Sequence, residues 1–350
     1  MENRSANFLV KLPVSSFSFT MSTGIISISA IIHHEPLISS VLLLIGIASL
    51  FCIMFLYALK AATDHGTIIE EYHDNRRFFG FFTISAGIDV IATRLMLTDI
   101  STYDYAFFII SVIFLLTFTI MFLIKLLSKK LIFRRDKVYS DWLNLTVALE
   151  ASAISMAVYY LETSPPPEIV YLFIFTLILM GLISYASINF IEGSNLVKPA
   201  REMEFNGMFF INMGAGAILS LASFELLMVP IHFPALINQQ ILDFLFAAGG
   251  IYATIWLPVV LFRYFSALFN IKGIRYRVSQ WAIIFPLGMY SVTTHYLSEF
   301  FHFYGIFNVI SYAAFVAAIC AWAIECIIAA RHIIRYWQAI LEIEDIENPA

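Results

Sequence analysis

The sequence has few charged residues and few cysteines for its length. Only 13% of its 350 residues are charged, whereas 60% are apolar. Soluble domains carry about 25% charged residues, so this composition excludes an ordinary soluble enzyme. Walker and Rossmann glycine patterns are absent, which leaves nucleotide-driven pumping without support. The three cysteines, Cys52, Cys320 and Cys326, lie in apolar stretches and predict buried, inert thiols without a disulfide.

Long apolar stretches account for almost the whole chain. Each is close to the ~20 residues that a helix needs to cross a bilayer. They cover residues 17–33, 37–59, 78–97, 105–127, 141–161, 168–190, 206–229, 235–262, 279–299 and 304–330. We therefore predict an all-α integral membrane protein, embedded in the lipid bilayer, with ten transmembrane helices. Residues 1–350 form a single transmembrane domain that ends in an acidic cytoplasmic tail, 333–350.

The basic residues predict the orientation. If both termini are cytoplasmic, all but one of the 20 Lys and Arg residues lie on the cytoplasmic side, and the exception is Arg94. Cytoplasmic loops are enriched in Lys and Arg, and the loss of one helix would scramble the pattern. The sequence thus predicts a multi-pass protein of the cell membrane with cytoplasmic N- and C-termini.

A ten-residue pattern recurs along the chain. It reads FTMSTGIISI from Phe19 and FTISAGIDVI from Phe82, and related segments begin at Leu145, Phe209 and Phe285. A fixed period indicates a copied unit. We place five tandem helical hairpins at about 13–60, 76–127, 139–190, 204–262 and 277–332. The odd helices then share one polarity, which predicts an inner ring around a pore with the even helices as an outer layer. The small residues of the pattern could instead serve only helix packing.

Two segments carry a resemblance to a known family. They are FSFTMSTGIISI (17–28) and QWAIIFPLGMYSVTT (280–294), the second with a Trp-x-x-x-Phe-Pro run. They resemble the tellurite-resistance/C4-dicarboxylate transporter family, which includes the slow anion channels of plant guard cells. This resemblance implies a homotrimer in which each protomer carries its own pore. It also implies that Phe285 is an aromatic plug that occludes the pore.

The repeat by itself also predicts a gate. Its first positions, Phe19, Phe82, Leu145, Phe209 and Phe285, would form an apolar collar if all of them face inward. Such a collar stops ions by dewetting. The chain contains 34 phenylalanines, so ordinary packing against lipid or other helices is the alternative.

Charged and polar residues inside the spans are candidates for lining or tuning the pore. Glu150 replaces the glycine of the repeat, and Asp89 and Arg94 lie in the preceding copy. These groups could tune anion passage or couple it to protons, or they could simply be paired or protonated. The hydroxyl and amide side chains of the inner helices complete the predicted lining: Ser22, Thr23, Ser85, Asn212 and Thr293.

Histidines gather at the outer ends of the first and ninth helices. His295, Glu299 and His302 share one face if the ninth helix continues that far, and His33 and His34 end the first. This group could sense pH near 6 at the outer mouth, or it could be solvated without a special role. Metal binding is the third alternative, although we expect no bound metal.

Three function classes follow. The sequence favours a gated channel for small inorganic or organic anions, which is not an enzyme and needs no cofactor or nucleic-acid partner. A proton-coupled transporter of malate, another C4-dicarboxylate or a related anion is the alternative, using Asp89 and Glu150. An intramembrane metalloenzyme built on His295, Glu299 and His302 is the third class.

Overall fold

The computed structural model describes residues 12–98, 102–131, 140–192, 207–230, 239–270, 276–302 and 304–347. Every regular element in these ranges is helical. Five helices, which we name the inner helices, are α2 (Ser18–Ile32), α5 (Phe82–Met96), α7 (Leu143–Glu162), α9 (Ile211–Met228) and α11 (Trp281–Phe300). The outer helices are α3 (Pro36–Thr63), α6 (Thr102–Leu127), α8 (Glu168–Glu192), α10 (Gln239–Asn270) and α12 (Tyr304–Glu347).

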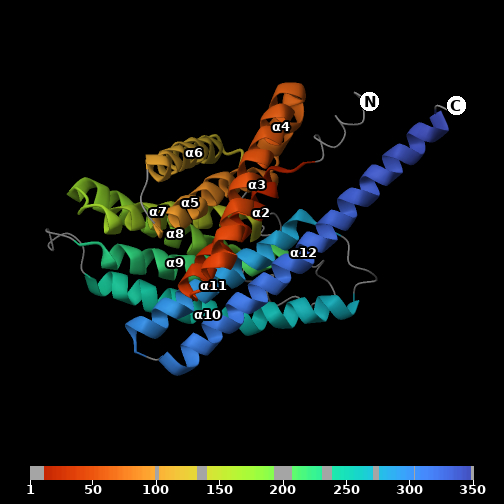
Figure 1. The fold of residues 1–350 in the computed structure, drawn as a ribbon. Coiled ribbons are helices and arrows are strands. Elements are labelled where there is room, and N and C mark those ends of the chain that lie inside the picture. Colours follow the sequence, from red (N-terminus) through yellow and green to blue (C-terminus); the bar gives the residue numbers. More distant parts are fainter. Residues whose placement is uncertain are drawn as a thin grey trace.

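The inner helices contact one another in chain order. Helix α2 packs against α5, α5 against α7, α7 against α9, α9 against α11, and α11 returns to α2. Each inner helix also packs against the outer helix that follows it in the chain. Figure 1 shows the helices side by side, with α12 extending past the ends of the others.

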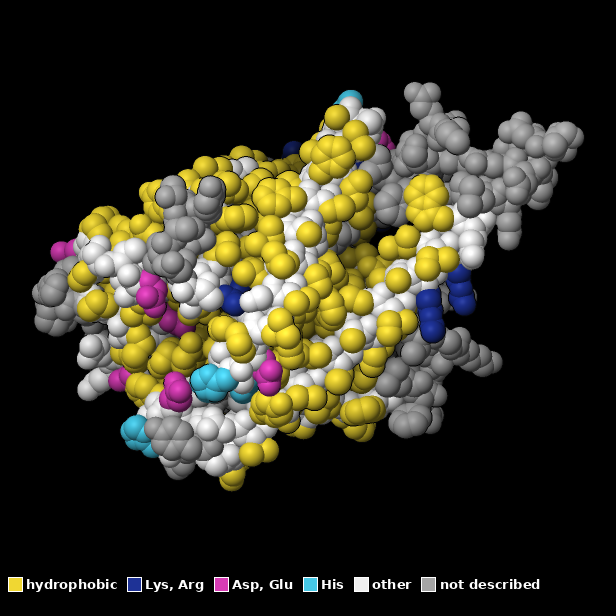
Figure 2. Space-filling model, in the orientation of Figure 1, with side chains coloured by type: hydrophobic (Ala, Val, Ile, Leu, Met, Phe, Trp, Pro, Cys, Tyr) yellow, Lys and Arg dark blue, Asp and Glu magenta, His cyan; other side chains and the backbone are white. Residues whose placement is uncertain are grey.

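Burial separates the two sets of helices. The inner helices are buried along most of their length, including their serines and threonines. The outer helices expose large apolar side chains, such as Leu44 and Phe55 on α3 and Ile120 on α6. Figure 2 shows apolar side chains over most of one face of the molecule. An exposed apolar surface of this extent is typical of contact with lipid.

The cysteines belong to this lipid-facing layer. Cys52 on α3 and Cys320 on α12 are exposed, and Cys326 is half-buried. The expectation that all three are buried is therefore wrong. The even helices face outward, so an apolar neighbourhood in the sequence does not mean an interior position.

Nine helical stretches in the described ranges are long and apolar enough to cross a membrane, so the protein is a multi-pass membrane protein. Ten were predicted, and α11 is the one that is not among the nine. It is 20 residues long, but residues such as Ser291, Thr293 and His295 lower its hydropathy. Most of α11 is buried among other helices, so its side chains need not match the apolarity of lipid.

A short 3-10 turn precedes every inner helix. These turns are η1 (Val14–Phe17), η2 (Arg77–Phe81), η3 (Ser140–Trp142), η5 (Gly207–Phe210) and η6 (Val278–Gln280). Apolar side chains of η1, η2, η3 and η5 are buried, so these four turns fix the points at which their inner helices begin, whereas η6 has no buried residue.

Two features were not predicted. A nine-residue helix, α4 (His65–His73), follows α3, and the Asp64 side chain caps it by accepting a hydrogen bond from the Thr67 backbone N–H. At the other end of the chain, α12 continues without a break through residues 333–347, which were predicted to be a separate tail.

Candidate functional site

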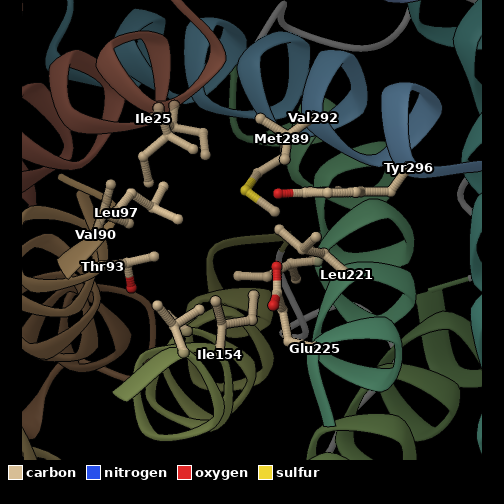
Figure 3. A pocket seen from close by; sticks show the side chains of 14 residues that line it. Ile25, Val90, Thr93, Leu97, Ile154, Leu221, Glu225, Met289, Val292 and Tyr296 are labelled. Carbon is tan, nitrogen blue, oxygen red and sulfur yellow. The ribbon is translucent and has the colours of Figure 1, made fainter. Parts of the chain in front are cut away.

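A cavity lies where all five inner helices face one another. Its volume is about 20 Å³, which is room for one water molecule and too little for a hydrated anion. Figure 3 shows the labelled side chains pointing from the surrounding helices toward this common space. The lining residues are Ile25 and Ile28 (α2), Val90, Thr93 and Leu97 (α5, with Leu97 at its end), Ala151, Ile154 and Val158 (α7), Ile218, Leu221 and Glu225 (α9), and Met289, Val292 and Tyr296 (α11).

Most of the lining is apolar, and its polar groups are few. Glu225 is the only charged residue among the lining side chains, and Thr93 and Tyr296 supply hydroxyl groups. In Figure 3 the carboxyl group of Glu225 and the hydroxyl of Tyr296 both point into the cavity. The chemistry of the cavity therefore depends mainly on the charge state of Glu225.

One helical turn before the cavity, the five inner helices carry side chains of unequal size. Residues four positions apart lie on the same helix face. The residues four positions before the first lining residue of each helix are Met21, Ala86, Val147, Gly214 and Phe285. All five are buried. Phe285, with no exposed surface, is the largest side chain at this level, and its neighbours in the set are mostly small.

Two residues of the predicted collar lie on other faces of their helices, and a third lies before its helix. Phe19 and Leu145 each precede a lining residue of the same helix by nine positions, which is two and a half turns, and Phe209 lies in the turn η5 before α9. Phe19 packs edge-on against Trp281 with ring centroids 4.6 Å apart. Phe209 packs against Trp256 of the outer helix α10 at 5.4 Å.

Phe82, the remaining collar residue, is fully buried and packs against Phe118 of the outer helix α6 at 6.1 Å. The collar stays a prediction, but the glycines of the repeat align the fifth copy differently from its phenylalanine. Gly24 follows the first residue of the pattern by five positions, whereas Gly288 follows Phe285 by only three. If the repeats are aligned on their glycines, Phe285 falls two positions later in the repeat than Phe19 does.

The hydroxyl groups predicted to line the pore hold helices together. The Ser22 hydroxyl donates to the Trp281 carbonyl at 2.8 Å, and the Thr293 hydroxyl donates to the Ala217 carbonyl at 2.9 Å. Thr23 accepts from the indole N–H of Trp322 on α12 at 2.9 Å. The Ser85 hydroxyl donates to the Phe82 carbonyl, and the Asn212 side-chain amide donates to the Phe209 carbonyl. These contacts agree with the packing role that the sequence left open.

Arg94 is buried where the inner helices α2 and α5 meet the outer helix α3. Its Nε donates to the hydroxyls of Ser27 on α2 at 3.1 Å and Ser39 on α3 at 2.7 Å. Those two serines also bond to each other's backbone carbonyls. The guanidinium thus ties α5 to the α2–α3 pair, although its neighbour Thr93 lines the cavity.

The two buried carboxyl groups of the predicted pore also lie between helices. Asp89 accepts a hydrogen bond from Ser152 of α7 at 2.5 Å. Glu150 has no exposed surface, and neither of its carboxyl oxygens has a hydrogen-bond partner. Its carboxyl group fills the space beside Gly181 of the outer helix α8, where a Cβ atom would overlap with it. Neither residue lines the central cavity.

This contact predicts that Gly181→Ala destabilises the protein. The new methyl group would overlap with the fully buried Glu150 side chain, and overpacking of this kind costs about 1–3 kcal/mol. Thermal unfolding in detergent should show a lower midpoint for Gly181→Ala and recovery in the Gly181→Ala/Glu150→Gly double variant. Gly305→Ala is the matched control, because a Cβ at Gly305 meets open space. Equal midpoints for the two single variants would contradict the contact.

At the outer end of α2, His33 joins the last pair of helices. Its Nε2 lies 3.1 Å from the Ser291 hydroxyl and 3.0 Å from the Ser311 hydroxyl. Burial, together with the neighbouring His295 and His34 rings, lowers the pKa of His33 to about 4. Protonation of His33 is thereby moved below the range near pH 6 in which the outer histidines were predicted to act.

The predicted face of His295, Glu299 and His302 is interrupted. Helix α11 ends at Phe300, and His302 follows it with a φ of 57°. His295 and Glu299 remain on one face, with His295 Nε2 3.3 Å from Glu299 Oε1. Within the ranges that the structure describes, no three His, Cys, Asp or Glu side chains are placed to hold a metal ion.

Comparison of the sequence with models of protein families identifies one family. The family model described as voltage-dependent anion channel matches residues 11–330. This chain belongs to the voltage-dependent anion channel family. Membership implies a channel or transporter for small anions and not an enzyme. A search of curated proteins finds no match to the chain.

In this member of the voltage-dependent anion channel family, the sequence analysis missed two cavity residues. It did not identify Glu225 or Tyr296 as part of the path, although both lie on the lining face of their helices. The signal was present for Glu225, because it follows Ile218 and Leu221 by seven and four positions. Residues at this spacing share one helix face, so Glu225 lies on the same face as these two apolar residues.

Proposed function

We propose that this member of the voltage-dependent anion channel family is a gated anion channel whose path runs between the inner helices. The observation that carries the proposal is the cavity to which all five inner helices contribute side chains. Phe285 lies one turn along the same face of α11 from Met289, which lines the cavity. This position supports the proposal that Phe285 closes the path.

A phenyl ring is a suitable closure for such a path. An anion must shed its water to pass an apolar constriction, and water itself leaves a narrow apolar passage. Because the other side chains at the level of Phe285 are mostly small, rotation of this one ring would open the path. A gate of this kind requires no movement of a helix.

The proposal includes the setting of the channel. The protein lies in the cell membrane with its N- and C-termini cytoplasmic, in accordance with the distribution of Lys and Arg. On the face shown in Figure 2, acidic and histidine side chains gather at one end and basic side chains lie along the far part of α12. The channel assembles as a homotrimer in which each protomer has its own path, as the family resemblance implies.

A proton-coupled transporter for a dicarboxylate is the second candidate. It is favoured by Glu225, a carboxyl group inside the cavity that could carry a proton together with an anion. Asp89 and Glu150 are buried residues of the inner helices α5 and α7, but their carboxyl groups lie between helices and do not line the cavity.

Anion flux from liposomes tests both candidates. The purified protein is reconstituted, and the fluxes of chloride, nitrate and malate are measured with and without a pH gradient. A channel follows the anion gradient alone, so its reversal potential stays at the anion value when a pH gradient is imposed. A coupled transporter shifts its reversal potential with the pH gradient. Loss of all anion flux in well-folded protein would overturn both candidates.

A further inference from the structure

Glu225 has a position that no other charged residue of the described chain shares. It lines the cavity, and its carboxyl group points inward beside the Tyr296 hydroxyl in Figure 3. Its side chain is largely buried, with 7% of its surface exposed. On the proposed path, an anion at the level of this cavity would pass close to that carboxyl group.

No cation compensates Glu225 in the described part of the chain. The nearest candidate on the lining helices is Arg94, and its guanidinium is bonded to Ser27 and Ser39 on the other side of α5. The charged group that interacts electrostatically with Glu225 is another acid, Glu162 at the end of α7. The negative charge of an ionised Glu225 is therefore not neutralised by a neighbouring cation in the described part of the chain.

The other helices packed against α9 contribute no positive charge at this level. Helix α11 supplies the Tyr296 phenol, which interacts electrostatically with both Glu225 and Glu299. Helix α10 meets this part of α9 with the ring of Phe246, 5.0 Å from that of Phe224. Helix α8 approaches α9 nearer its other end, where Tyr185 contacts Gly216.

We propose that Glu225 makes the passage of anions along the path dependent on protons, and this inference rests on the proposed channel function. Like charges repel, and the repulsion grows where apolar side chains replace water. An ionised Glu225 opposes the passage of anions through the cavity, and a protonated Glu225 removes this barrier without any change in shape. The residue thereby gives the channel a dependence on protons that does not require coupled transport.

The test compares chloride flux in liposomes for the wild type, Glu225→Gln and Glu162→Gln at neutral and mildly acidic pH. Glutamine has the shape of a protonated glutamate and cannot ionise. We expect Glu225→Gln to conduct about tenfold faster than the wild type at neutral pH. This factor is at the low end of what the repulsion between two unit charges in contact gives when the surroundings are less polar than bulk water. Acidification should raise wild-type flux and leave Glu225→Gln nearly unchanged. Glu162→Gln, whose side chain is exposed at the end of α7, should keep the pH dependence but move it to lower pH, because a negative neighbour favours protonation of Glu225.

Two further measurements separate the possible failures. Glu225→Met offers an apolar side chain of similar volume if the glutamine variant does not fold, and it should show the same loss of pH dependence. Wild-type reversal potentials in a chloride gradient should stay at the chloride value when both sides are acidified, while the flux rises. If Phe285→Ala conducts anions while Glu225→Gln keeps the wild-type rate and pH dependence, this inference fails and the channel function stands. If none of these proteins conducts anions, both fail.

Discussion

Replacing Glu71 with alanine should lower the free energy of unfolding by about 3–5 kcal/mol, because it leaves a buried lysine without its partner. The Nζ of Lys60 lies 2.9 Å from Glu71 Oε1, and the two side chains are 0% and 3% exposed. The Tyr57 hydroxyl donates to the other carboxylate oxygen at 2.7 Å. These bonds hold α4 against the end of α3, so their loss should also release α4.

The thermal midpoint in detergent measures this effect, and limited proteolysis within α4 measures the release. Glu70→Ala is the matched control, since Glu70 is the neighbouring residue on the same helix and is exposed. The Lys60→Met/Glu71→Leu double variant should recover most of the stability, because apolar residues of similar volume can replace a buried ion pair. If Glu71→Ala and Glu70→Ala melt together, the pair does not anchor α4.

The transmembrane helices could be predicted from the sequence because apolar runs of about 20 residues have few alternative structures. Helix α4 was missed because nine residues with polar ends carry no such signal, and only the Asp64 cap marks its beginning. The 3-10 turns before the inner helices were also missed. They arise from tertiary packing of residues such as Phe17 and Phe78, which looked like ordinary members of apolar runs.

The cavity was harder to predict because its lining depends on the rotation of each helix. A repeat of about 63 residues sets which helices are equivalent, but an error of two residues turns a side chain to the far side. Phe285 was selected through a family resemblance and lies on the cavity face, whereas Phe19 lies on the opposite one. The place of Glu150 depends on Gly181, a residue of another helix that leaves space for the carboxyl group. No pattern within one helix contains that information.

Replacing Phe285 with alanine should raise anion flux by about tenfold or more. A decrease of only about 1.4 kcal/mol in a barrier raises a rate tenfold, and removal of the ring leaves Met21, Ala86, Val147 and Gly214 as the other residues at this level. The passage then becomes wide enough to keep water, so an anion no longer loses its hydration shell there. Phe285→Leu should give an intermediate flux, because a smaller apolar group closes the passage less completely.

The same substitution should lower stability, since truncation of a buried phenylalanine costs about 3–5 kcal/mol. The flux measurement therefore needs a control with the same loss of volume. Phe79→Ala provides it, because Phe79 is 1% exposed and packs on Trp142 and on Phe122 of the outer helix α6. If both variants leak equally, the flux comes from a loosened bundle. If Phe285→Ala alone conducts, and does so with anion selectivity, the ring itself closes the path.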